Sequence, residues 1–152
     1  FPAIRQWHQR VRVAIRKDKC LTNSWGRIWP VEYYQQNDEL FRRAYSFLLQ
    51  SECADALNQW GFLACWRWLR DNRLHSRILL QEHDGLVLSC PSDEVYDVAL
   101  FLRESLEQPR AYDGVELSIP IEYQVGPAWG QGTEWKVLPE RAVVEQTVKE
   151  HL

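Results

Sequence analysis

The sequence has no methionine, no long apolar run and no clustered cysteines, and each absence limits what the protein can be. No apolar stretch approaches the ~18 residues that a helix needs to cross a bilayer. The N-terminus also lacks the charged segment followed by an apolar one that is typical of a signal peptide. We therefore expect a cytoplasmic protein with no membrane partner.

The four cysteines are scattered, with no CxxC pair, and no two histidines have the spacing of metal ligands. This pattern predicts neither a zinc site nor a disulfide framework. We expect reduced, mostly buried thiols at Cys20, Cys53, Cys65 and Cys90.

What is present fits one globular unit, because the chain has 152 residues and 45% of them are hydrophobic. The net charge is −3, but residues 1–27 carry seven of the 18 Lys and Arg residues and only one of the 21 acids. This excess of basic residues at the N-terminal end, beside a more acidic remainder of the chain, predicts that a polyanion binds only that end of the protein. Since the chain begins at Phe1 and lacks methionine, we expect a processed piece or one half of something larger.

Two helices are predicted in the first half of the chain. The first, from Phe1 to Lys19, begins just after Pro2 and carries basic residues beside an apolar face. Asn37 and Asp38 offer an N-cap for the second, which runs to about Leu69. Its apolar residues occur on all sides of the helix, which predicts a central helix that packs on more than one side. Between the helices, Leu21 to Tyr34 is β-like, with a turn at residues 23–26.

The second half predicts a hairpin, a helix and a further strand. Arg77 to Glu82 and Leu86 to Cys90 are the hairpin strands, joined at His83–Gly85, where Asp-Gly favours a primed turn. A helix follows from about Asp93 to Glu107, and Glu116 to Val125 alternates as an edge strand because it contains Pro120. We expect one compact sheet with helices on one face, and a tail after Trp129 with a short helix from about Pro139.

The hairpin tip has two interpretations. A carboxylate on a short, stiff turn is well placed to hold a divalent cation, because the turn fixes its position and leaves the cation open to a ligand. Asp-Gly is also a very common hairpin dipeptide, so these residues taken alone favour a plain turn.

The neighbouring sequence favours the first interpretation, in which the carboxylate at the hairpin tip binds a cation. The run LLQEHDGLVLSCPSDE, residues 79–94, resembles motif C of the family A DNA polymerases, the group of bacterial DNA polymerase I and many phage replicases. Upstream, FRRAYSFLLQSECADAL resembles the family's helix in which a glutamine follows an arginine by eight residues. Downstream, IPIEYQVGPAW resembles the family's closing strand and its Gly-x-x-Trp ending. FPAIRQW and LTNSWGRIWP are similar to the segment that enters the palm after the fingers.

The resemblance runs from Phe1 to about Trp129 and implies an α+β fold. That fold has a palm hairpin and antiparallel sheet packed by helices, a long central helix, and a basic N-terminal helix from the fingers side. The implied division is a fingers-to-palm segment at 1–36, a palm segment at 37–129 and a C-terminal tail at 130–152. The implied reaction is template-directed nucleotidyl transfer by a two-metal mechanism, with primer–template DNA and dNTP as ligands.

The resemblance also assigns roles to single residues. Asp84 would hold Mg²⁺, with the two ions shared with a motif A aspartate outside this chain, and His83 would contact the primer end, unless it only pins the turn. Gln50 would check base pairing in the minor groove, although an isolated glutamine on an apolar helix is more often a buried amide. DNA contacts are further implied for Arg42, which could instead be a solvated helix end, and for Arg43 and Arg27.

Three residues depart from the family pattern. Gly85 stands where glutamate is common, Glu82 replaces an apolar residue, and Ser46 replaces an asparagine. The nucleotide-binding helix and motif A of the family correspond to sequence before Phe1, so we expect activity only with a second polypeptide or the rest of a cleaved chain. The alternative is a catalytically inactive remnant that binds DNA or a partner. A third possibility is a single-subunit RNA polymerase, because those enzymes also have a His-Asp hairpin. If a phage encodes the chain, it would work in the cytoplasm of a bacterial host.

Overall fold

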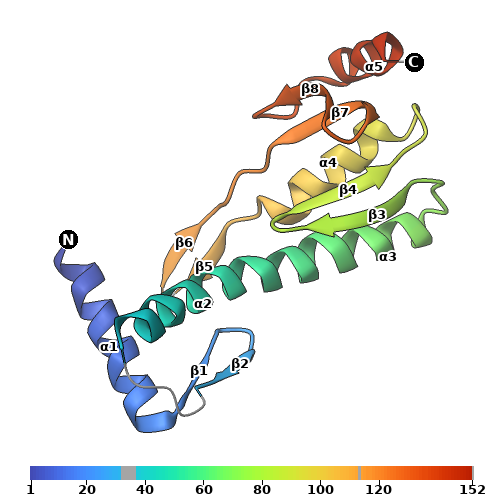
Figure 1. Cartoon of the computed structure of the whole chain (residues 1–152). Helices are drawn as coiled ribbons and strands as arrows, with labels where there is room; N and C mark the ends of the chain where they lie inside the picture. The colour runs from blue at the N-terminus through green and yellow to red at the C-terminus, as the bar shows by residue number, and fades with distance from the viewer. Residues whose placement is uncertain (32–36, 113, 152) are drawn as a thin grey trace. The chain divides into compact units, whose positions relative to one another are not determined.

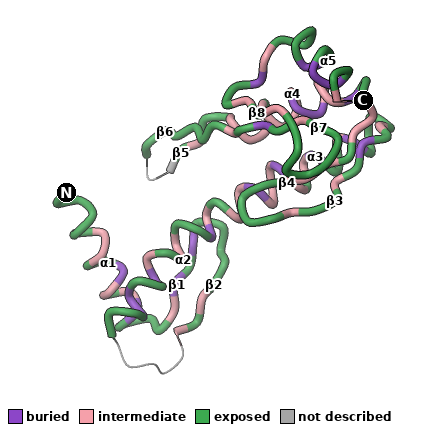
Figure 2. The backbone as a smooth tube through the Cα atoms, turned by 45° about the horizontal axis from the view of Figure 1, so that its top comes forward, coloured by how far each residue is buried: buried purple, intermediate pink, exposed green. Residues whose placement is uncertain are grey.

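The fold combines α-helices with two-stranded antiparallel sheets, which confirms the expected α+β class. The computed structural model describes residues 1–31, 37–112 and 114–151. Contacts divide the chain into two compact units, Phe1–Asp55 and Ala56–Leu152. Each unit has its own buried residues, most of them on its helices (Figure 2).

The first unit is built on two helices and a small hairpin (Figure 1). α1 (Pro2–Asp18) starts at the predicted proline and buries Val11 and Ile15. β1 (Cys20–Thr22) pairs with β2 (Ile28–Pro30), which confirms the turn between them; residues 32–34 of the expected β-like segment lie outside the described residues. The core joins α1 and β1 to α2 through Val11, Ile15, Leu21, Leu40, Phe41 and Ala44.

The long helix begins where the sequence predicts and then changes its form. The Asn37 side chain accepts a hydrogen bond from the Leu40 amide at 2.9 Å, which confirms it as the cap of α2 (Asp38–Ala56). α2 is followed by a π-helix, η1 (Leu57–Leu63), and then by α3 (Ala64–Asp71). The expectation of packing on several sides is wrong for α3, because Cys65 and Leu69 are buried on one face while Trp66 is 49% exposed.

In the second unit, the predicted hairpin packs against two helices. β3 (Arg77–Glu82) and β4 (Gly85–Ser89) form an antiparallel pair beside α3 and α4 (Val95–Leu106) (Figure 1). Trp68 of α3 stacks on Phe101 of α4 with ring centroids 4.6 Å apart. The shared core is made by Cys65, Leu69 and Val98, with Ile78 and Leu88 of the hairpin packed against it.

The strand expected at Glu116–Val125 is wrong, because these residues belong to two different hairpins. β5 (Arg110–Tyr112) pairs with β6 (Val115–Leu117), and β7 (Tyr123–Ala128) pairs with β8 (Gln131–Trp135). Between them, Pro120 has no amide hydrogen to donate. Ser118 Oγ and the Ile121 amide donate instead to the main-chain and side-chain oxygens of Glu107, at 2.6 and 2.9 Å.

The single compact sheet is also wrong for the described residues, which form four separate two-stranded sheets. The segment after Trp129 contains a strand as well as the predicted helix. β8 pairs closely with β7, since a Cβ on Gly126 would lie only 1.8 Å from the Gln131 carbonyl oxygen. The predicted last helix is confirmed as α5 (Arg141–Glu150), which buries Val144 and Val148 against Tyr123.

Two further expectations concern thiols and membranes. Cys65 is buried and Cys20 and Cys90 are half-buried, but Cys53 is exposed, so the expectation of buried thiols fails there. All four cysteines are free. Among the described residues, no helix combines the length and apolar character that crossing a bilayer requires.

Candidate functional site

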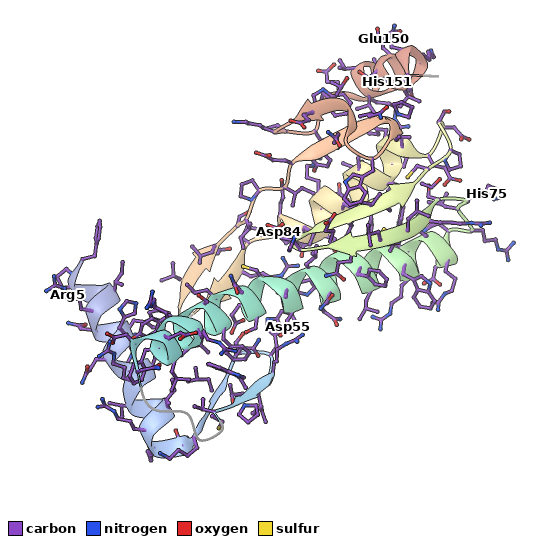
Figure 3. The ribbon with its side chains drawn as sticks, in the orientation of Figure 1. Arg5, Asp55, His75, Asp84, Glu150 and His151 are labelled. Atoms are coloured by element: carbon purple, nitrogen blue, oxygen red, sulfur yellow. The ribbon has the colours of Figure 1, made fainter. Side chains whose placement is uncertain are left out.

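The tip of the β3–β4 hairpin is a two-residue loop of His83 and Asp84 (Figure 3). Glu82 pairs directly with Gly85, so Gly85 is the first residue of β4 and the predicted Asp-Gly turn is displaced by one position. The left-handed conformation falls on His83, whose φ is 52°. The strand register decides this, because it leaves only His83 and Asp84 between the last paired residues.

The hairpin is held close to the helices behind it. Gly61 of η1 is buried, and a Cβ there would lie 3.3 Å from Cδ1 of Leu86 and 2.9 Å from Cδ1 of Leu57. Leu86 follows the tip by two residues, so the absence of a side chain at Gly61 lets η1 approach β4 near the tip. On β3, Leu79 is an unpaired bulge residue, and bulges often lie beside functional sites.

The start of β3 is fixed by a carboxylate that the sequence did not reveal. Glu94, in the predicted first turn of the helix that begins near Asp93, accepts hydrogen bonds from the amides of His75 and Ser76 at 2.8 Å and from Ser76 Oγ at 2.6 Å. These bonds lower the pKa of Glu94, with the His75 amide as the largest cause. Because Glu94 is the residue just before α4, these bonds hold the segment that leads into β3 against the start of α4.

The side chains at the tip are open to solvent. Glu82, His83 and Asp84 are exposed, and none makes a hydrogen bond or ion pair within its unit among the described residues. No group of three or more His, Cys, Asp or Glu side chains comes together as a metal site in the described parts of the chain. Mg²⁺ is commonly held by one or two carboxylates together with waters and substrate phosphates. The tip therefore fits a role as one contributor to a magnesium site.

Three of the residues predicted to contact DNA lie on the exposed side of α2. Arg42, Arg43 and Gln50 are all exposed, which excludes the alternative that Gln50 is a buried amide. Arg43 and Gln50 are seven residues apart, nearly two helical turns, so both side chains share one face about 10 Å apart along the axis. The opposite face, with Leu40, Phe41, Ala44 and Ser51, is buried.

Arg27 has a partner on α2. Its Nε donates to Asp55 at 2.9 Å, and its Nη2 forms an ion pair with the same carboxylate. The hydrogen bond from Arg27 is the main reason that the pKa of Asp55 is lowered. The Arg27 side chain is still 49% exposed, so its outer edge can meet a phosphate.

The basic residues of α1 have different surroundings. Arg12 donates to the Tyr45 hydroxyl at 2.8 Å and lies over the Phe41 ring, so it helps α1 pack on α2. Arg5, Arg10 and Lys17 are exposed. The predicted site residues thus fall in two groups: Arg27, Arg42, Arg43 and Gln50 in the first unit, and His83 and Asp84 in the second.

Comparisons with known proteins point in one direction. Residues 1–131 match the model of the family described as "DNA polymerase family A". The chain is 26% identical to the DNA polymerase of Bacillus phage SP01 over 144 residues, covering 88% of this chain and 16% of that protein. It is 38% identical to DNA polymerase I of Geobacillus stearothermophilus over 90 residues, covering 58% of this chain and 10% of that protein.

Among solved structures, the chain resembles the POL domain of Pol1 from M. smegmatis, in a complex with DNA primer-template and dNTP. The TM-score is 0.62 at 25% identity, over 70% of this chain and 20% of that one. The chain thus spans less than one fifth of the length of the curated relatives described above.

Proposed function

Because the chain belongs to DNA polymerase family A, we propose that it forms part of a DNA-directed DNA polymerase and contributes the motif C carboxylate to nucleotidyl transfer. The observation that carries the proposal is the exposed, unpaired Asp84 on a two-residue hairpin tip. A structural aspartate in a turn usually bonds to nearby backbone amides. Asp84 makes no such bond within its unit among the described residues, so its carboxylate is available to a cation.

In this proposal Asp84 holds Mg²⁺ together with a motif A aspartate from outside the 152 residues. When bound, the two ions would lower the pKa of the primer 3′-hydroxyl and stabilise the leaving pyrophosphate. His83, next to Asp84, contacts the primer end. Glu82 is a second exposed carboxylate beside the tip and adds negative charge where the family has an apolar residue.

The exposed side of α2 is the proposed DNA surface. Gln50 donates a hydrogen bond to the minor-groove acceptor that every correct base pair offers at a similar position, so it checks pairing without reading sequence. Arg42, Arg43 and Arg27 contact the sugar–phosphate backbone. All four side chains are at the surface, as this role requires.

The proposed reaction needs groups beyond those in this chain. One aspartate cannot position two metal ions and a triphosphate, so we propose that the activity requires the remaining polymerase parts, in a second polypeptide or elsewhere in the same protein. The three segments 1–36, 37–129 and 130–152 are kept as its proposed fingers-to-palm, palm and C-terminal parts. A catalytically inactive, DNA-binding remnant is the second candidate, favoured by Gly85, Glu82 and Ser46.

The test is primer extension by a preparation that contains this chain together with the rest of its polymerase. Asp84→Asn keeps the size of the side chain and removes its charge, and it should slow nucleotide addition more than about a hundredfold. Binding of primer–template should change little. Glu82→Gln is the matched control, and it should retain most of the rate.

Each outcome decides between the two candidates. Near-normal extension by Asp84→Asn contradicts the assignment of Asp84 as a metal ligand. No extension by the unaltered preparation, with DNA binding intact, supports the inactive remnant instead.

A further inference from the structure

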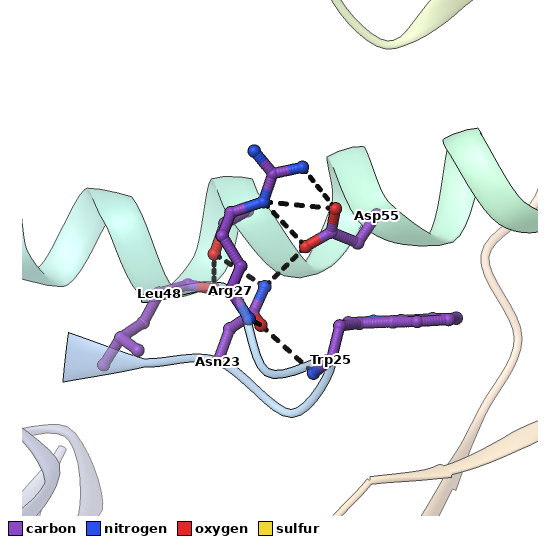
Figure 4. A network of polar contacts seen from close by, with 6 residues as sticks. Asn23, Trp25, Arg27, Leu48 and Asp55 are labelled. Atoms are coloured by element: carbon purple, nitrogen blue, oxygen red, sulfur yellow. Dashed lines mark hydrogen bonds and ion pairs between the residues drawn. The ribbon is translucent and has the colours of Figure 1, made fainter. Parts of the chain in front are cut away.

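A buried asparagine joins the β1–β2 turn to the last turns of α2 (Figure 4). Asn23 is only 6% exposed, and both ends of its amide are used. Its Oδ1 accepts hydrogen bonds from the amides of Trp25 and Arg27 at 3.1 and 2.9 Å. Its Nδ2 donates to Asp55 at 2.7 Å and to Ser51 at 3.1 Å. One side chain therefore shapes the turn and binds the helix.

Two further links reinforce this contact. Arg27 pairs with Asp55 through its Nε and Nη2, and both the amide and the hydroxyl of Ser24 donate to the Glu52 carboxylate. We name this set the turn clamp: Asn23, Ser24 and Arg27 of the turn, with Ser51, Glu52 and Asp55 of α2. The α2 members lie one, two and five residues after Gln50 in the sequence.

The clamp holds the part of α2 that follows the apolar core. The buried core residues of α2 are Leu40, Phe41 and Ala44, and Phe47 and Leu48 pack against them, so the core ends just before Gln50. Past the clamp, the helical pattern changes to the π form at Leu57, two residues after Asp55. Helices change register at such points, and π segments are frequent at functional sites. The hydrogen bonds of Asn23 and Arg27 therefore fix the rotation of the last α-helical turns.

We infer that the turn clamp is a positioning device for Gln50 and so sets how strictly the enzyme checks the primer-terminal base pair. The inference rests on the proposed role of Gln50 in the minor groove. A hydrogen-bonding group works only when it is held within about 0.5 Å of its productive position. One residue of helical rotation turns a side chain by about 100°, so a helix that is loose at Ser51 would spread Gln50 over many positions. Asn23 and Asp55 act through the helix and need not touch DNA.

The experiment compares two primers in the extension-competent preparation. One ends in guanine and the other in 3-deazaguanine, which lacks the minor-groove N3 acceptor. The unaltered protein should extend the analogue about tenfold more slowly, the effect expected of one lost hydrogen bond. Gln50→Ala should extend both primers at the same, lower rate. Asn23→Ala should reduce the tenfold difference to about threefold or less, with little added effect in the Gln50→Ala background.

The variants separate failure of the inference from failure of the proposed function. If Gln50→Ala keeps the tenfold difference, the proposed role of Gln50 is wrong. If Gln50→Ala abolishes the difference and Asn23→Ala keeps it in full, the positioning role of the clamp is wrong. Asp55→Asn replaces the clamp carboxylate with an amide of nearly the same size and should fold, so it is the substitute variant if Asn23→Ala does not fold. It should also reduce the difference in extension rate between the two primers. Thr22→Ala, which changes an exposed residue of β1 outside the turn clamp, should behave as the unaltered protein.

Discussion

The left-handed conformation of His83 predicts that this residue costs stability at the hairpin tip. His83 has a φ of 52°, a region that L-residues enter at a cost of about 1–2 kcal/mol, although histidine enters it more often than most. Replacing His83 with glycine should relieve about 1 kcal/mol of this strain. Glycine also gives the unfolded chain more freedom, which costs about 0.4–1 kcal/mol. The net change should lie between zero and a slight stabilisation.

A matched substitution isolates the strain. Asp84 is the other loop residue and its φ is not positive, so Asp84→Gly pays the entropic cost with no relief. The free energy of opening the hairpin should therefore differ by about 1 kcal/mol between the two variants, with His83→Gly the more stable. The comparison removes the unfolded-state term that the two variants share.

Native-state amide hydrogen exchange across β3 and β4 measures this difference directly, since about 1 kcal/mol corresponds to roughly a fivefold change in protection. Extension assays on the same variants should show a lower rate for His83→Gly if His83 contacts the primer end. Such a pairing of gained stability and lost activity is expected where strain is kept for function. Equal loss of protection in both variants would refute the reasoning about strain.

Two other predictions concern the first unit and the thiols. The lowered pKa of Asp55 adds stability that is present above its unfolded value of about 3.9 and is lost as the pH falls through the folded value. Asp55→Asn should therefore have about 0.5–1 kcal/mol less stability to urea at pH 7, a small figure because Arg27 is half exposed. The difference should shrink as the pH falls below about 3.9 and through the lowered pKa of folded Asp55, and an unchanged difference would exclude the ion pair as its source. Burial raises the pKa of Cys65 to about 12, so at pH 8 maleimide should modify Cys53 far faster than Cys65. Primer–template should slow the reaction at Cys53 if this side of α2 binds DNA, and an unchanged rate with saturating DNA would argue against that surface.

Much of the local structure could be predicted because its causes lie within a few residues. Pro2 starts α1, Asn37 caps α2, and the turn residues at 23–26 join β1 and β2, all by contacts close in sequence. The hairpin was found for the same reason, but its register was not, because the choice between His83-Asp84 and Asp84-Gly85 as the loop depends on how the strands pair along their length. A one-residue change in pairing moves the left-handed position from one side chain to the next.

Errors arose where distant groups compete for a segment. The alternation of Glu116–Val125 is typical of a strand, yet Glu107, at the end of α4, takes the Ser118 hydroxyl and the Ile121 amide. Glu94 likewise has the sequence position of a cap residue, but its carboxylate bonds to His75 and Ser76, which lie 18 or 19 residues earlier. No periodicity in the sequence reports such bonds.

Residue types and their spacing were enough to predict the family-like order of motifs, the acidic hairpin tip and the basic residues near the N-terminus. The solvent exposure of Gln50, the pairing of Arg27 with Asp55 and the burial of Asn23 between a turn and a helix are known only from the folded chain. Residue type and spacing fix local conformation, whereas Asn23 and Arg27 bond to groups of α2 that lie 28 or more residues away in sequence and that only folding brings together.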